Sequence, residues 1–101
     1  MSKLLLEKYK KVKNEELNKI LSKIKKEPVF LGEKRLLSEE EVINFKNELG
    51  IDDNNIIILL DCYDNNYLVF DMIDNCFKIY NIDDNLIYNS KFIETILKDI
   101  I

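Results

Sequence analysis

Apolar residues near the start of the chain recur at steps of three and four, which is the period of an α-helix. One stripe is centred on Tyr9, and a second stripe, offset in phase, runs from Leu17 to Ile24. Asn14 is suited to begin a second helix, because its side chain can accept a bond from a backbone amide and the two glutamates after it favour the positive end of the helix dipole. The pattern predicts a helical segment over residues 1–27 and leaves open whether it is one helix or two.

Two further helices are predicted later in the chain. Ser38 and Glu41 have the spacing of a capping box, in which each side chain accepts a bond from the other residue's backbone amide. Apolar residues follow at helical spacing, and Gly50 suits the left-handed conformation that ends many helices. These signals predict a helix over residues 38–49. A broad apolar stripe predicts a last helix over residues 90–100 that packs on a sheet.

Aspartate-asparagine pairs divide the middle of the chain into short segments. The pairs recur at spacings of 11, 10 and 10 residues, at positions 53–54, 64–65, 74–75 and 84–85. Both residue types tolerate left-handed turns, and the segments between the pairs are rich in β-branched and aromatic residues. This period predicts an antiparallel meander of three to four strands over residues 55–88. Side-chain alternation predicts that one face packs on the core and the other carries tyrosines and charge.

These elements together predict one domain over residues 1–101, because a chain of this length has room for one core. The expected fold class is α+β. The N-terminal helical segment and the capped helix pack on a three- to four-stranded antiparallel β-meander, and the C-terminal helix closes the fold. The short apolar piece at residues 29–32 is expected to be an edge strand or an anchored loop.

The composition argues against several kinds of chemistry. The 101 residues include no histidine, which removes the usual general base at neutral pH and His-dependent triads and metal sites. Cys62 and Cys76 are too few for a disulfide framework, and no phosphate-binding glycine loop is present. We therefore expect no enzyme, with no catalytic, cofactor-binding or metal-binding residues. Because a signal-peptide pattern and a bilayer-length apolar run are also absent, we expect a cytoplasmic protein that does not bind membranes.

Charge is divided unevenly along the chain. Residues 1–35 carry 11 basic and 5 acidic side chains, a net charge of +6, whereas residues 36–101 carry 4 basic and 14 acidic side chains, a net charge of −10. A basic helix lying beside an acidic sheet would account for this division. An acidic surface that attracts a basic protein partner would account for it equally well. Direct binding of nucleic acid is not expected, because the acidic part would repel phosphates.

The candidate contact surface is the acidic meander. Its carboxylates would pair with a basic partner, and tyrosines near the strand ends would add buried area and hydrogen bonds. The candidate partner-binding residues are Asp61, Tyr63, Asp64, Asn65, Tyr67, Asp71, Asp74, Tyr80, Asp83 and Asp84.

Three stretches of the chain carry a family resemblance. Residues 38–42 read Ser-Glu-Glu-Glu-Val, and residues 57–71 combine an apolar run, an aspartate, an Asp-Asn turn and an aromatic strand that ends in aspartate. Residues 77–84 add an aromatic strand and an acidic turn. Over residues 37–100, about two-thirds of the chain, the sequence resembles the later part of the SMI1/KNR4 (SUKH) family. The resemblance implies an α+β fold and a role common among its bacterial members, that of an immunity protein that blocks a toxin domain, often a nuclease.

The leading expectation is therefore a small acidic inhibitor that binds and blocks a basic, nucleic-acid-handling protein, such as a toxin nuclease. An alternative in the same class is a phage-encoded inhibitor of a bacterial nuclease defence, similar to an anti-CRISPR protein. A second alternative is a non-catalytic oligomerising or regulatory module in which the N-terminal helix joins copies of the chain.

Overall fold

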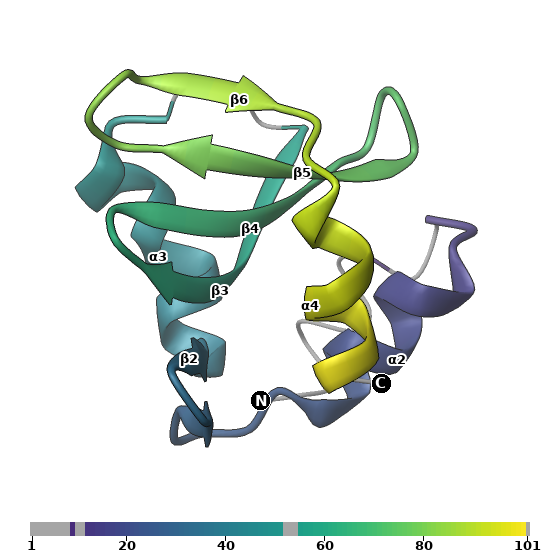
Figure 1. The fold of residues 1–101 in the computed structure, drawn as a ribbon. Coiled ribbons are helices and arrows are strands. Elements are labelled where there is room, and N and C mark those ends of the chain that lie inside the picture. The colour runs from purple at the N-terminus through teal and green to yellow at the C-terminus, as the bar shows by residue number, and fades with distance from the viewer. Residues whose placement is uncertain (1–8, 10–11, 52–54, 101) are drawn as a thin grey trace.

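The computed structural model of this chain describes residues 9, 12–51 and 55–100. Over residues 12–51 and 55–100 the chain forms an α+β fold with three helices and six strands (Figure 1). In chain order the elements are α2 (Glu15–Lys23), β1 (Val29–Leu31), β2 (Lys34–Leu36), α3 (Glu39–Leu49), β3 (Ile56–Tyr63), β4 (Asn66–Asp71), β5 (Cys76–Asn81), β6 (Leu86–Tyr88) and α4 (Phe92–Ile100).

The six strands join in one sheet in which sequence neighbours are also spatial neighbours, in the order β1-β2-β3-β4-β5-β6. Every pair is antiparallel, and α3 lies in the connection between β2 and β3. Because the strands alternate in direction, the β1–β2, β3–β4 and β5–β6 turns all lie at one end of the sheet. The β4–β5 turn lies at the opposite end.

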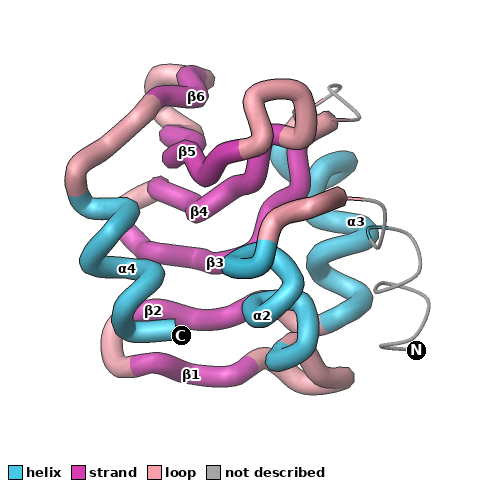
Figure 2. The backbone as a smooth tube through the Cα atoms, turned by 90° about the vertical axis from the view of Figure 1, so that its right-hand side faces the viewer, coloured by secondary structure: helices cyan, strands magenta, loops and turns pink. Residues whose placement is uncertain are grey.

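Helices cover both faces of the sheet, with α3 on one face and α2 and α4 on the other (Figure 2). Phe45 of α3 packs edge to face on Tyr67 of β4, with the ring centroids 5.8 Å apart. Since side chains alternate along a strand, Leu68 and Phe70 point to the opposite face, towards α2 and α4. There Phe70 packs edge to face on Phe77 of β5 at 5.0 Å.

The helix boundaries follow the local signals in the sequence. Asn14 caps α2 by accepting a 3.0 Å bond from the backbone amide of Leu17, which confirms a helix beginning at this point. Both halves of the capping box predicted for α3 form, and Gly50 ends that helix in the left-handed conformation at φ 70. Of the segment before Val12, the structure describes Tyr9, which is helical and buried, so the prediction of one helix or two falls mostly outside the described residues.

The Asp-Asn pairs form turns with left-handed residues, as their composition predicted. Asn75 and Asn85 have φ values of 53 and 49. The β3–β4 turn is tighter, with positive φ at three successive residues, which are Tyr63, Asp64 and Asn65. The pair at residues 53–54 lies outside the described residues.

The sheet is wider than the sequence predicted, with six strands among the described residues where three to four were expected. β1 confirms the edge strand expected at residues 29–32, whereas β2 was not anticipated. β2 has three residues, Lys34–Leu36, of which two are charged, so its sequence shows no strand-like alternation. It is a strand because β1 and β3 pair with it on both sides.

The prediction that one face of the meander carries tyrosines and charge is wrong for the middle of the sheet. All four residues from Tyr67 to Phe70 are buried, because α3 covers the face that was expected to be open. A strand that is covered on both faces is typically apolar at every position, and Ile56–Leu60 of β3 is such a run.

Candidate functional site

Four carboxylates lie along one end of the sheet, in three successive hairpin turns. Glu33 lies in the β1–β2 turn, Asp64 in the β3–β4 turn, and Asp83 and Asp84 in the β5–β6 turn. All four residues are exposed. We call these four residues the acidic end.

Two of these turns are bonded to each other. The side-chain amide of Asn65 donates a 2.9 Å bond to the carboxylate of Asp83, and the backbone amide of Ile82 donates a 2.9 Å bond to the Asn65 carbonyl. The side-chain amide of Asn81 donates a 2.8 Å bond to the side-chain oxygen of Asn66, at the base of the same two turns. The spacing between the carboxylates of the two turns is therefore set by the fold.

The β5–β6 turn is also fixed from within. The backbone amide of Asp84 donates a 3.0 Å bond to the side-chain oxygen of Asn81. The hydroxyl of Tyr80, which is 3% exposed, donates a 3.0 Å bond to the side-chain oxygen of Asn85. A buried tyrosine thus anchors the loop that presents Asp83 and Asp84.

None of the four carboxylates of the acidic end forms an ion pair with a lysine or arginine that the structure describes. Exposed like charges repel one another over about one Debye length, ~8–10 Å at physiological salt. The charge at this end is therefore available to a binding partner.

Asp61 was a candidate contact residue, and the structure instead places it in an ion-pair cluster under α3. Arg35 of β2 lies 2.6 Å from the carboxylate of Glu41 and 3.5 Å from that of Asp61. The bond to Glu41 raises the pKa of the Arg35 guanidinium. Burial raises the pKa of the Glu41 carboxyl, because it disfavours the charged form. The bonds from Arg35 and from the Ser38 amide have a larger effect and hold this pKa below its ordinary value.

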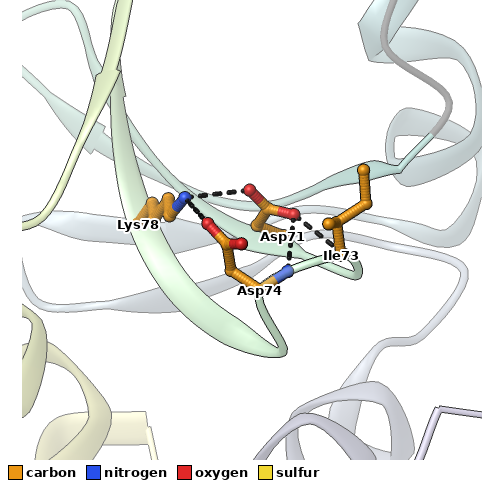
Figure 3. A network of polar contacts seen from close by, with 4 residues as sticks. All are labelled: Asp71, Ile73, Asp74 and Lys78. Carbon is orange, nitrogen blue, oxygen red and sulfur yellow. Dashed lines mark hydrogen bonds and ion pairs between the residues drawn. The ribbon is translucent and has the colours of Figure 1, made fainter.

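Asp71 and Asp74, two further candidates, lie at the far end of the sheet in a network with Lys78 (Figure 3). The Lys78 ammonium donates a 2.9 Å bond to Asp71 and also bonds Asp74, which raises the pKa of the lysine. Asp71 accepts two further bonds from the backbone amides of Ile73 and Asp74. This network closes the β4–β5 turn, and Lys78 offsets one of its two negative charges.

The tyrosine candidates separate into two groups. Tyr67 and Tyr80 are 9% and 3% exposed and belong to the core between the sheet and α3. Tyr63 is 41% exposed and lies at the end of β3, next to Asp64. Of the ten sequence candidates, the structure brings five together at the same end of the sheet: Tyr63, Asp64, Asn65, Asp83 and Asp84.

One member of the acidic end, Glu33, was missed by the sequence reasoning. Glu33 lies within residues 1–35, which have a net positive charge, so it was not expected to belong to an acidic surface. The sequence did hold one signal, because Glu33 directly follows Gly32 and glycine is typical of turns. In the structure Gly32 has a φ of 64 and lies in the β1–β2 turn.

Both cysteines of the chain lie among the described residues. Cys62 and Cys76 are free and half-buried, and burial raises the pKa of the Cys62 thiol to about 11, so this thiol is protonated at neutral pH. Among the described residues, no group of three or more histidine, cysteine, aspartate or glutamate side chains is placed to hold a metal ion. Within the same residues, no helix has the length and apolar character needed to cross a membrane.

Comparisons with protein-family models, with curated proteins and with solved structures give no match to this chain.

Proposed function

We propose that this chain is a stoichiometric inhibitor that binds a basic, nucleic-acid-handling protein through its acidic end. The observation that carries the proposal is that four exposed carboxylates, in three turns at the same end of the sheet, form no ion pair with a described cation. Elsewhere the same sheet pairs aspartates with cations, with Arg35 beside Asp61 and Lys78 beside Asp71.

The contrast between the two ends of the sheet supports a binding role. An unpaired cluster of like charges does not favour folding, and a basic partner would supply the missing cations. The bonds between the β3–β4 and β5–β6 turns hold the backbone that carries Asp64, Asp83 and Asp84 in place before binding, which lowers the entropy that association costs. Carboxylates in a fixed array could occupy the positions of nucleic-acid phosphates on a nuclease, and their field would steer the encounter.

The proposal narrows the candidate contact set to the acidic end together with Tyr63 and Asn65. Asp61, Asp71, Asp74, Tyr67 and Tyr80 support the fold behind this surface. The biological setting that the family resemblance favours is toxin immunity, in which the partner is a toxin nuclease encoded beside this chain. A neighbouring toxin gene would support that setting, and surrounding phage structural genes would favour a counter-defence inhibitor.

Affinity capture with charge-reversed variants tests the proposal. The purified chain is immobilised, exposed to a lysate of its source organism, and compared with the variant Asp64→Lys/Asp84→Lys. The matched control is Glu27→Lys/Glu40→Lys, which changes the net charge equally. Both control positions are exposed, and they flank β1 and β2 on the side away from the β1–β2 turn.

We expect the wild type and the control to capture the same basic protein in equimolar amount, and the Asp64→Lys/Asp84→Lys variant to lose it. The captured protein should cleave nucleic acid, and added wild-type chain should stop the cleavage. Equal capture by both variants, or a captured nuclease that is not inhibited, would contradict the proposed function.

A further inference from the structure

A groove of about 410 Å³ opens beside the acidic end, on the face of the sheet that carries α4. The sheet contributes Cys62, Ile79 and Tyr88 to its lining, and α4 contributes Phe92 and Ile96. In Figure 2, α4 lies across this face of the sheet. Asn66, Ser90 and Thr95 also line the groove, so polar and apolar side chains share its lining.

Two aromatic side chains at this groove remain exposed. Phe92 is 75% exposed at the first position of α4, and Tyr88 is 38% exposed on the edge strand β6. Leu86, on the same edge strand, is 53% exposed. Exposed apolar side chains that gather around a concavity mark sites of association more often than scattered ones do.

The rim of the groove shares residues with the acidic end. Glu33 and Asp64 line it, and neither has an ion pair with a described cation. Lys34, which also lines the groove, lies 3.9 Å from Asp99 of α4, so its charge is partly offset. A groove that presents the exposed aromatic side chains of Tyr88 and Phe92 beside two unpaired carboxylates is complementary to an apolar side chain that has cationic neighbours.

We propose that this groove is the anchor pocket of the inhibitor, and that its occupant is a partner segment with one or two large apolar side chains flanked by lysine or arginine. The inference rests on the proposed function and identifies the part of the surface that holds the partner. The apolar side chains enter between Tyr88 and Phe92, and the flanking cations meet Glu33 and Asp64. Binding energy in protein interfaces concentrates at such buried anchors, while surrounding charges mainly govern the approach.

The charge of the chain argues against a second copy as the occupant. The formal net charge is −4, and the groove lies against the part of each copy where unpaired carboxylates gather. Two copies that met through this groove would bring their acidic ends together, which is electrostatically unfavourable.

Three short peptides probe the groove directly. The first has a central Leu-Phe pair flanked on each side by two arginines, the second replaces that pair by two serines, and the third keeps the pair and replaces the arginines by glutamates. Binding is followed by amide chemical shifts in the ¹⁵N-labelled chain. We expect the first peptide to bind with a dissociation constant on the order of 0.1–1 mM, as suits a small unconstrained ligand. Its shifts should centre on Cys62, Ile79 and Thr95.

Two pairs of variants separate the groove from the rest of the surface. Phe92→Ala should weaken binding of the first peptide about tenfold, whereas Phe30→Ala should change it less than twofold. Phe30 is a matched control because it is 67% exposed and faces the α3 side, as its pairing with Arg35 shows. Thr95→Trp, at an exposed lining position, should block the groove, whereas Asn44→Trp on α3 should not.

The outcomes distinguish the two proposals. If the arginine-serine peptide binds as tightly as the arginine-Leu-Phe peptide, or if Phe92→Ala and Phe30→Ala act alike, the groove inference fails and the acidic end remains supported. If the glutamate peptide binds as well as the arginine peptides, the electrostatic basis of the proposed function fails as well. Sedimentation that shows a dimer dissociated by Phe92→Ala would assign the groove to a second copy and overturn the inference.

Discussion

The side-chain amide of Asn65 donates a 2.9 Å hydrogen bond to the carboxylate of Asp83, which is 18 positions further along the chain. The two residues belong to different turns, and both turns carry aspartates of the acidic end. Asn65 has a φ of 63, a left-handed conformation that asparagine tolerates. Its backbone therefore forms the β3–β4 turn while its side chain bonds Asp83. One residue thus shapes its own turn and fixes the position of the neighbouring one.

Replacing Asn65 by glycine should loosen the two turns without unfolding the sheet. Glycine accepts the positive φ, so the change removes the bond to Asp83 and adds chain entropy to the unfolded state. We expect the free energy of unfolding to fall by about 1 kcal/mol, and amide exchange at Ile82 to accelerate several-fold. Asn75→Gly, at φ 53 in the opposite turn, is the control and should leave exchange at Ile82 unchanged.

The capping box of α3 should contribute measurably to the free energy of unfolding. The backbone amide of Glu41 donates a 3.3 Å bond to the Ser38 hydroxyl, and the backbone amide of Ser38 donates a 3.1 Å bond to the Glu41 side chain. Ser38→Ala should lower the free energy of unfolding by about 1 kcal/mol, measured as a lower urea midpoint with an unchanged slope. An unchanged midpoint would show that α3 does not depend on this cap.

Gly50 should resist substitution for reasons of backbone conformation alone. Its φ is 70, and a Cβ added there would meet no atom within 4 Å. Gly50→Ala should therefore cost about 1 kcal/mol through left-handed strain, with no steric contribution. Gly50→Asn should cost less, because asparagine tolerates this conformation. Equal losses in the two variants would contradict this explanation.

Stability should fall in acid because two carboxyl groups are stabilised in the charged form. The pKa of Asp71 is lowered: burial opposes its ionisation, but bonds from Lys78 and from the amides of Asp74 and Ile73 outweigh it. The pKa of Glu41 is lowered similarly by Arg35. Each group binds its proton more readily in the unfolded chain, so its contribution is present above the unfolded pKa of about 4 and is lost as the pH falls through the folded value.

Urea unfolding at a series of pH values between about 7 and 2 measures this loss. Lys78→Met removes the cation that holds the pKa of Asp71 down, and it should flatten the acid limb of the stability curve. Lys91→Met is the control, since Lys91 is exposed and forms no ion pair with a described residue. A curve for Lys78→Met that falls as steeply as the wild type would remove Asp71 from the explanation.

Local signals predicted the parts of the fold that are set by neighbouring residues. The caps at Asn14 and Ser38, the helix end at Gly50 and the Asp-Asn turns are determined within a few positions of the chain. The three meander strands were predictable for the same reason, because a short turn forces adjacent segments to pair.

Contacts between distant segments were not predictable from the pattern. β2 is a strand only because β1 and β3 pair with it. Tyr67 and Tyr80 read as surface residues in the sequence, and they are buried because α3 crosses back over the sheet. The candidate aspartates look alike in the sequence, and it is Arg35 and Lys78 that neutralise Asp61 and Asp71.

The central claim is that the acidic end steers a basic partner into place, and the association rate tests it most directly. The rate of binding to the captured partner is measured at low and at physiological salt for the wild type, for Asp83→Lys/Asp84→Lys and for Glu27→Lys/Glu40→Lys. Reversal at the acidic end should slow association by about tenfold or more at low salt, with a smaller effect at physiological salt, while the control stays close to the wild type. Equal slowing by the two variants, or a rate that does not depend on salt, would contradict the account.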